Sequence, residues 1–180
     1  TEAVADDASR NLHYPRERID VIGRGRDGGR YQFRSDAARR TVRAELGVGE
    51  EVPVILTVGR QDPQKRQADL VAAMKLVRRV APRAQLWLAG KPGRSTPQLL
   101  ALAEEWGDEV RLLGHRTDIP ALLSAADVFA FPSEREGLGG VLIEAMASGC
   151  AIVASAIPTS LEVLDGGRCG LLYPPGDVPA

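Results

Sequence analysis

The chain reads VPVILTV at residues 52–58, an apolar run without the period-two alternation of a strand that has one wet face. Five similar runs follow it, and each is separated from the next by a segment with the apolar period of a helix. The six expected strands cover residues 52–58, 84–89, 110–113, 127–131, 151–154 and 170–173. Because strands buried on both faces and joined by helices run parallel, the pattern predicts an α/β fold, a doubly wound sheet of about six parallel strands with helices on both faces.

The segments between these strands carry helix signals. Pro97 suits the first turn of the second helix, and Gly149 is placed to stop the fourth. The expected helices cover residues 67–80, about 97–106, a segment after residue 118, and 140–148. Before residue 50 the pattern is weaker: it predicts a polar helix at 3–12, a strand at 19–22, a glycine- and arginine-rich loop at 23–30, and a helix at 36–46.

Charge and composition exclude several classes of protein. Of the 180 residues, 44% are apolar and 26% charged, which is enough for a buried core. The 23 basic and 24 acidic residues give a net charge of -1, so no overall positive field attracts nucleic acid or a lipid surface. The longest apolar runs fall short of the roughly 18 residues of a membrane-spanning helix, and a signal-peptide pattern is missing. We therefore expect a cytoplasmic protein and, because the sequence starts at Thr1, a piece of a longer one.

The residues directly after the expected strands carry the chemistry, because ligands of open parallel sheets bind beyond the carboxyl ends of the strands. The loop after residues 52–58 carries Arg60 and Lys65, and the glycine-rich loop after residues 127–131 runs into the helix that carries Glu144. Glycines let a ligand approach the backbone, and a helix N-terminus offers free N–H groups and a partial positive charge. Two cations and these amides would cradle a diphosphate, and the sequence has no Asp-x-Asp pair that would hold Mg²⁺ for the same task.

Two carboxylates flank the glycine-rich loop. Glu136 lies in the loop, and Glu144 lies about one turn inside the helix. Each could bind a vicinal diol through two short hydrogen bonds, and a nucleotide sugar has a diol at both ends of its diphosphate. An alternative interpretation stays open, in which Glu136 only favours a helix N-terminus electrostatically and Glu144 is a solvated helix residue.

Isolated histidines and cysteines add no cluster to this picture. Cys150 and Cys169 lack the close spacing of a zinc motif, so we expect two buried free thiols. His115 stands alone, and a surface or loop role is its simplest interpretation.

The sequence EGLGGVLIEAMASG at residues 136–149 resembles the E-x7-E segment of retaining glycosyltransferases of family 4, which have the GT-B fold. The flanking loops match in the same order, from residues 59–65 through 126–133 to 152–162 and 170–172, and the likeness covers about residues 14–177. It implies that residues 19–180 form the C-terminal, Rossmann-like donor-binding half of such an enzyme, truncated before the final helices, with 1–18 as an interdomain linker. The N-terminal, acceptor-binding domain would be missing from this chain.

The resemblance also implies a function, the transfer of a hexose from a UDP-, GDP- or ADP-sugar to an acceptor hydroxyl, with retention and without a metal or other cofactor. Arg60 and Lys65 would hold the diphosphate, Glu144 the ribose, and Glu136 with nearby backbone amides the donor sugar. The implied catalytic residues are Arg60, Lys65 and Glu136. The implied nucleotide-sugar-binding residues are Gly59, Arg60, Lys65, His115, Arg116, Asp118, Glu136, Gly137, Leu138, Gly139, Gly140, Val141 and Glu144. No nucleic acid partner is implied, and a peripheral membrane contact would come only through the missing domain.

Residues 114–118 match the loop that receives the base, largely through backbone groups near Arg116. The Asp118 side chain would contact the base or, alternatively, cap the helix that follows. The chain departs from the family pattern at Gly140, where an aliphatic residue usually lies against the nucleotide, so that wall should be looser. Residues 156–159, AIPT, replace a common Asp-x-Gly-Gly or Asp-x-Pro-Gly turn, which puts a sugar or phosphate contact there in doubt. Residues 23–25, GRG, replace Pro-Asn-Gly and are expected to face the interdomain cleft.

Two other functions stay open from the sequence. Residues 23–28, GRGRDG, fit the G-x-G-x-x-G pattern of NAD(P)-binding folds after a short strand, with Arg60 placed for an NADP phosphate. Residues 29–33 intervene where that fold would open a helix, which argues against this alternative. The other alternative is a non-catalytic nucleotide-sugar-binding or regulatory module, because the same fold and ligand site do not prove turnover.

Overall fold

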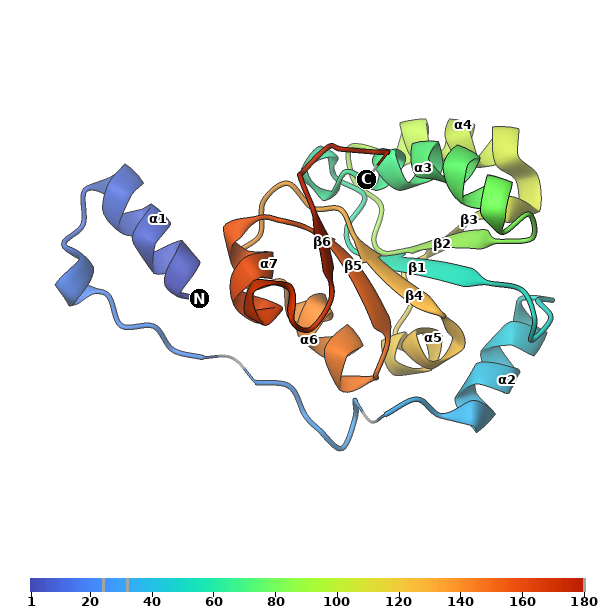
Figure 1. The fold of residues 1–180 in the computed structure, drawn as a ribbon, viewed down its shortest axis with the longest axis horizontal. Helices are drawn as coiled ribbons and strands as arrows, with labels where there is room; N and C mark the ends of the chain where they lie inside the picture. Colours follow the sequence, from blue (N-terminus) through green and yellow to red (C-terminus); the bar gives the residue numbers. More distant parts are fainter. Residues whose placement is uncertain (24, 32, 180) are drawn as a thin grey trace.

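The computed structural model describes residues 1–23, 25–31 and 33–179, and one parallel sheet forms its centre (Figure 1). The strands are β1 (Val54–Val58), β2 (Gln85–Ala89), β3 (Val110–Gly114), β4 (Val128–Phe131), β5 (Ala151–Ser155) and β6 (Leu171–Tyr173). Their order is β3-β2-β1-β4-β5-β6, and every neighbouring pair is parallel. The predicted α/β fold with about six parallel strands is confirmed.

Helices cover both faces of this sheet (Figure 1). On one face lie α3 (Gln67–Val80) and α4 (Thr96–Trp106). On the other lie α2 (Asp36–Glu45), α5 (Ile119–Ala125), α6 (Gly140–Ala147) and α7 (Pro158–Val163). Each face has its own apolar core: Met74 and Leu99 are fully buried on the first face, and Phe129 and Leu142 on the second. Burial on both faces explains why the strands read as continuous apolar runs.

Helix ends follow local chemistry closely. The bounds of α3 are those predicted, residues 67–80. Gly149, just beyond α6, has a φ of 70°, and the amide of Cys150 donates to the carbonyl of Ala145 at 3.1 Å. This left-handed residue closes the helix where the sequence predicts its end, because glycine adopts positive φ without strain.

The expected strand at residues 19–22 is wrong. The structure gives these residues no strand pairing, and the side chain of Ile22 is 88% exposed. A strand needs a neighbour for its backbone groups, and this segment runs outside the sheet (Figure 1). The expectation of two buried thiols is also wrong in part, because Cys169 is exposed and Cys150 half-buried. The helix α7 was not predicted, nor were the short 3-10 turns η1 (Arg16–Arg18), η2 (Pro63–Lys65), η3 (Gly107–Glu109) and η4 (Asp165–Gly167).

The first helix, α1 (Glu2–Leu12), packs beside α7. The carboxylate of Glu162 in α7 accepts hydrogen bonds from the amides of Glu2 at 3.0 Å and Ala3 at 2.9 Å. These are two of the N–H groups that a helix N-terminus leaves without internal partners, so α7 caps α1 from outside. In the described part of the chain, no helix is both long and apolar enough to cross a membrane.

A buried arginine fastens α2 to the sheet. Arg43 is 1% exposed, and its guanidinium donates to the carbonyl of Ala125 at 3.0 Å and to Asp127 Oδ2 at 2.7 Å. Asp127 also accepts a hydrogen bond from the amide of Val54, the first residue of β1, at 2.8 Å. Burial opposes the charge of Asp127, but this amide and the surrounding arginines outweigh it and hold the pKa of the carboxyl below its usual value.

Candidate functional site

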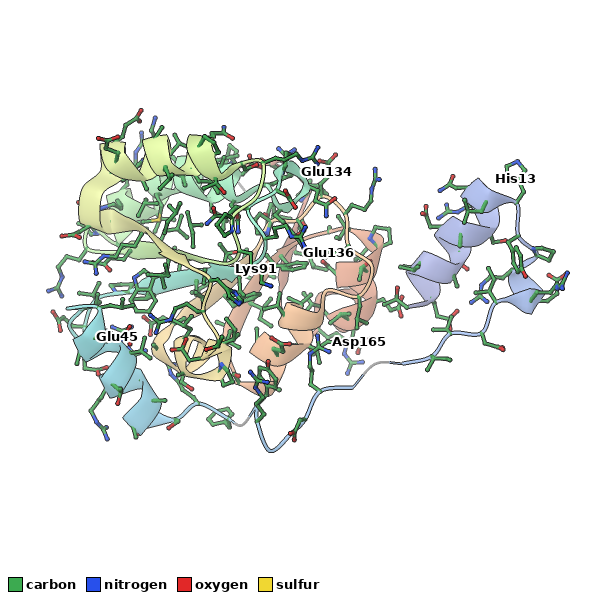
Figure 2. All side chains as sticks on the ribbon, turned by 180° about the vertical axis from the view of Figure 1, so that it is seen from behind. His13, Glu45, Lys91, Glu134, Glu136 and Asp165 are labelled. Carbon is green, nitrogen blue, oxygen red and sulfur yellow. The ribbon has the colours of Figure 1, made fainter. Side chains whose placement is uncertain are left out.

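The sheet changes its winding direction between β1 and β4. The chain leaves β1 toward β2 on one side and leaves β4 toward β5 on the other, so the loops after these neighbouring strands diverge. Ligands of open α/β sheets bind at such a point, beyond the carboxyl ends of the strands. The structure brings the two loops together there, since the amide of Glu134 donates to the carbonyl of Gln64 at 2.8 Å. Figure 2 shows Glu134, Glu136 and Lys91 near the middle of the view, between the sheet and α1.

The predicted cation Lys65 and the predicted carboxylate Glu136 form an ion pair between the two loops. Lys65 Nζ donates to Glu136 Oε1, and the two side chains are only 20% and 12% exposed. The hydroxyl of Ser133 donates to the same oxygen at 2.7 Å, and the hydroxyl of Thr159 donates to the carbonyl of Glu136 at 2.9 Å. Ser133 and Thr159 were not predicted as site residues, yet they hold Glu136 by its side chain and its backbone.

The glycine-rich loop ends at the N-terminus of α6. Gly139 has a φ of 63°, and the helix begins at the next residue without any side-chain cap. Its first amides are therefore available to an anion, as the cradle requires. Gly139 is buried and Leu138 half-buried, whereas Gly137 is exposed, with its carbonyl accepting a hydrogen bond from the Thr1 hydroxyl at 3.1 Å. The side chain of Val141 packs against the apolar core and so anchors the first turn of α6.

Glu144 lies one turn inside α6 and is not the solvated helix residue of the alternative interpretation. Its side chain is 14% exposed, and its Oε1 accepts a hydrogen bond from Arg26 Nε at 2.6 Å. Burial and the negative charge of this carboxylate together raise the pKa of the Tyr31 hydroxyl. Arg26 and Tyr31 were not predicted as site residues, because both lie more than a hundred positions before Glu144 in the sequence.

The remaining predicted cation, Arg60, stands at the edge of the site. Its side chain is 66% exposed, and its Nε is 3.8 Å from Asp62 Oδ2, which leaves it room to reach a ligand. Gly59 before it lies against the loop after β2: a Cβ on Gly90 would be 1.8 Å from the carbonyl oxygen of Gly59. Glycine at position 90 therefore lets the two loops touch.

Ion pairs of Arg116 hold the loop after β3, which is predicted to receive the base. The guanidinium of Arg116 binds both Asp118, at 2.8 and 2.7 Å, and Glu45 of α2, at 2.7 and 3.2 Å. These partners raise the pKa of Arg116, and Arg116 in turn lowers the pKa of Asp118. Asp118 occupies the cap position of α5, but its carboxylate makes no cap hydrogen bond. His115 is exposed.

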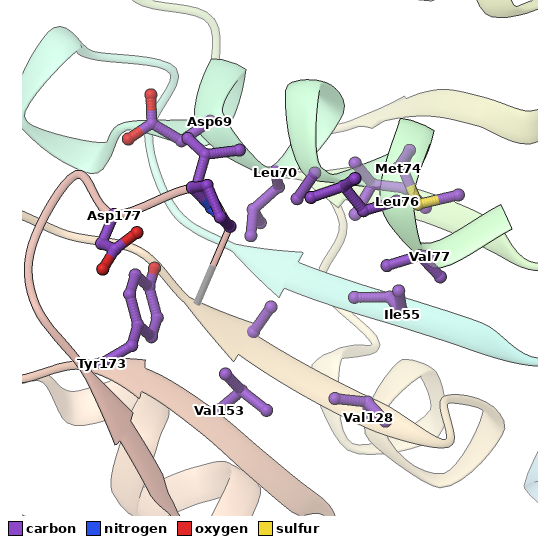
Figure 3. A pocket seen from close by; sticks show the side chains of 15 residues that line it. Ile55, Asp69, Leu70, Met74, Leu76, Val77, Val128, Val153, Tyr173 and Asp177 are labelled. Atoms are coloured by element: carbon purple, nitrogen blue, oxygen red, sulfur yellow. The ribbon is translucent and has the colours of Figure 1, made fainter. Parts of the chain in front are cut away.

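Of two cavities in the described structure, the larger lies away from the predicted site residues and the smaller borders Glu136. A cavity of about 380 Å³ opens between α3 and the face of β1, β4 and β5, and none of the predicted site residues lines it (Figure 3). Its walls are mostly apolar, with Leu70 and Val77 from the helix and Val153 from the sheet. A smaller cavity of about 230 Å³ lies where α1 meets the loop of Glu136 and the start of α7.

The described residues contain no group of three or more His, Cys, Asp or Glu side chains placed to hold a metal ion. The expectation that residues 23–25 face a cleft, and the G-x-G-x-x-G alternative at residues 23–28, both include residue 24, which lies outside the described residues.

Comparison with known proteins agrees with this geometry. The family model described as "Glycosyl transferases group 1" matches residues 38–180. The chain is 39% identical over 170 residues to an alpha-maltose-1-phosphate synthase of Mycolicibacterium smegmatis, covering 87% of this chain and 42% of the relative. It is 37% identical over 167 residues to a D-inositol 3-phosphate glycosyltransferase of Nocardia farcinica, covering 87% and 36%.

A solved structure also resembles this chain. The crystal structure of Anabaena Alr3699/HepE in complex with UDP and glucose superposes with a TM-score of 0.85 at 28% identity, over 96% of this chain and 47% of that one. The chain thus spans less than half the length of each of these three proteins. The fold, the order of the loops and these matches agree, and the chain belongs to the glycosyl transferases group 1 family.

Proposed function

We propose that this chain binds the donor of a metal-independent, retaining glycosyltransferase that moves a hexose from a nucleoside diphosphate sugar to an acceptor hydroxyl. The observation that carries the proposal is the Lys65–Glu136 ion pair between the loops after β1 and β4, in which the loop of Glu136 leads directly into the uncapped N-terminus of α6. Glu144 lies one turn further along the same helix. A cation, free amides and two carboxylates are the groups that would bind a diphosphate with a diol on each side.

Each residue then has a defined task. The α6 amides, Lys65 and the exposed Arg60 take the charge that grows on the diphosphate when the bond to the sugar breaks. Glu144 accepts hydrogen bonds from the ribose hydroxyls, and Glu136 accepts them from the sugar. Since Glu136 already holds Lys65, a donor that binds there brings its sugar and its diphosphate to two partners of one ion pair.

The relatives support the identity of the ligand. The Anabaena protein was crystallised with UDP, with UDP and glucose, and with UDP-glucose. The proposed donor of this chain is accordingly a UDP-, GDP- or ADP-sugar. The acceptor would be held by a domain outside residues 1–180, with residues 19–180 as the donor half and 1–18 as the linker. The cytoplasm is the proposed location.

The test is calorimetric titration of the chain with UDP, GDP, ADP and their glucose conjugates in buffer that contains EDTA. We expect one nucleotide series to bind, and no transfer or appreciable hydrolysis of the sugar, because ordering an acceptor and excluding water need the second domain. Failure of all six compounds to bind would overturn the proposal. A longer protein that contains this chain, binds the donor and never transfers the hexose would instead favour the non-catalytic module.

A further inference from the structure

Gly140, the first residue of α6, is not a glycine for reasons of backbone conformation. Nine other glycines have positive φ, among them its neighbour Gly139, whereas Gly140 does not have the left-handed conformation that excludes other residues. What a side chain at this position would meet is Arg26: a Cβ on Gly140 would be 1.8 Å from Arg26 Nη2 and 3.0 Å from Arg26 Cζ. The missing side chain at residue 140 is therefore space that the guanidinium of Arg26 fills.

Arg26 is well held in that space. Its side chain is 19% exposed, and its Nε donates to Glu144 Oε1 at 2.6 Å. Its Nη1 donates to the carbonyl of Gly25 at 3.4 Å. The guanidinium thus lies along the first turn of α6, from the carboxylate that we assign to the ribose toward the helix N-terminus that we assign to the diphosphate.

A cation at this place needs an explanation. The N-terminus of a helix carries a partial positive charge, so a guanidinium beside it is disfavoured unless an anion accompanies both. The carboxylate of Glu144 compensates the positive charge of Arg26 on one side, where it accepts the hydrogen bond from Nε. A planar guanidinium carries five donors, so its Nη groups can serve a second anion while Nε stays on Glu144. A phosphate at the α6 N-terminus is the anion that would satisfy the helix and the arginine together.

We propose that Arg26 is a binding residue of the donor site: its guanidinium fills the space left by the missing side chain of Gly140 and binds the ribose-phosphate junction of the nucleotide beside Glu144. This inference rests on the proposed function. It gives the site a third cation, contributed by a segment far in sequence from the β1 and β4 loops. It also makes Arg26 and Gly140 a matched pair, because a side chain at position 140 would displace the guanidinium of Arg26 from the place that it occupies.

The experiment measures the dissociation constant of the nucleoside diphosphate that wild type binds best among UDP, GDP and ADP. The variants are Arg26→Met, which keeps an unbranched apolar stem, Arg26→Ala, Gly140→Leu, and the double variant Arg26→Ala/Gly140→Leu. Arg83→Ala is the control, since Arg83 pairs at 3.1 Å with Glu51 in an exposed surface contact. Circular dichroism and thermal unfolding establish that each variant is folded under the titration conditions.

Both Arg26 variants should bind roughly tenfold or more weakly, the loss expected for a hydrogen bond to a charged group, while Arg83→Ala binds like wild type. Gly140→Leu alone should also weaken binding, because it expels Arg26. In the Arg26→Ala background the same leucine has free space, so it should cost nothing further. Wild-type affinity in a folded Arg26→Met variant would overturn the proposal. Tighter binding by that variant would overturn it too, because it would show that Arg26 blocks the nucleotide site instead of binding the nucleotide. Additive losses of affinity in the double variant would refute the pairing of Arg26 with Gly140. If wild type binds none of the three nucleotides, the proposed function itself fails, and this inference fails with it.

Discussion

Lys65 and Glu136 form an ion pair that joins the loop after β1 to the loop after β4, with neither side chain more than 20% exposed. The pair lies at the point where the sheet changes its winding direction. A cation that we assign to the diphosphate and a carboxylate that we assign to the sugar therefore neutralise each other in this structure. Any donor must exchange or share this contact, which makes the two residues energetically coupled.

Replacing Lys65 or Arg60 by alanine should weaken the binding of a nucleoside diphosphate by about 1.5 to 3 kcal/mol, the range for hydrogen bonds to charged groups. Calorimetric titration measures this loss, and Lys75→Ala, at an exposed position on α3, is the matched control with unchanged affinity. Wild-type binding that disappears in EDTA would show instead that a metal ion, and not these side chains, carries the diphosphate charge.

Arg43→Ala should destabilise the fold by about 1 to 3 kcal/mol, because it removes one of the three arginines around Asp127 and takes this donor away from the carbonyls of Gly49 and Val52. Urea unfolding followed by circular dichroism gives the number. Arg83→Ala removes an exposed ion pair instead and should cost no more than about 1 kcal/mol. Equal effects of the two substitutions would contradict the role given to Arg43.

The pH dependence of stability should contain a contribution from Asp127. Its pKa is lowered in the folded protein, so its ionised form stabilises the fold fully above the unfolded value, about 3.9, and this contribution is lost as the pH falls through the folded value. Asp127→Asn should therefore lower the unfolding free energy at pH 7 and flatten its decline below about pH 4. Parallel curves for wild type and variant would show that the carboxylate does not titrate in this way.

The two thiols should differ in reactivity. Burial raises the pKa of Cys150 to about 11, and its Sγ donates to the carbonyl of Leu123 at 3.2 Å, whereas Cys169 is exposed. Because the thiolate is the reactive form, an aromatic disulfide reagent at pH 8 should modify one thiol per folded chain and both after unfolding. Cys169→Ser should abolish the modification of the folded chain. Rapid modification that persists in this variant would contradict the assignment of the reactive thiol to Cys169.

Much of the fold can be predicted because its signals are local. The apolar runs mark all six strands, and Gly149 marks the end of α6 through its own left-handed conformation. The strand expected at residues 19–22 fails because pairing depends on a neighbour, which an apolar pattern such as that of Ile19 and Ile22 cannot reveal. The helix α7 is only six residues long, too short for a clear period.

The site residues also divide into those that local sequence signals predict and those that such signals do not reveal. Lys65, Glu136 and Glu144 stand beside strand ends and helix starts, so their places follow from the order of elements. Arg26 pairs with a residue 118 positions away, and Ser133 acts through a hydroxyl that no motif distinguishes. The local signal was Gly140: the sequence shows that a side chain is missing there, but it does not show that Arg26 fills the space.

The measurement that tests the donor site most directly is a calorimetric comparison of Glu136→Ala and Glu144→Ala, each titrated with a nucleoside diphosphate and with its sugar conjugate. Glu144→Ala should weaken both ligands by about 1 to 3 kcal/mol, because both contain the ribose. Glu136→Ala should weaken only the sugar conjugate, and the free diphosphate should bind no worse, since Lys65 is then released from its ion pair. If Glu136→Ala weakens both ligands equally, or Glu144→Ala weakens neither, the two carboxylates do not bind the two ends of a nucleotide sugar.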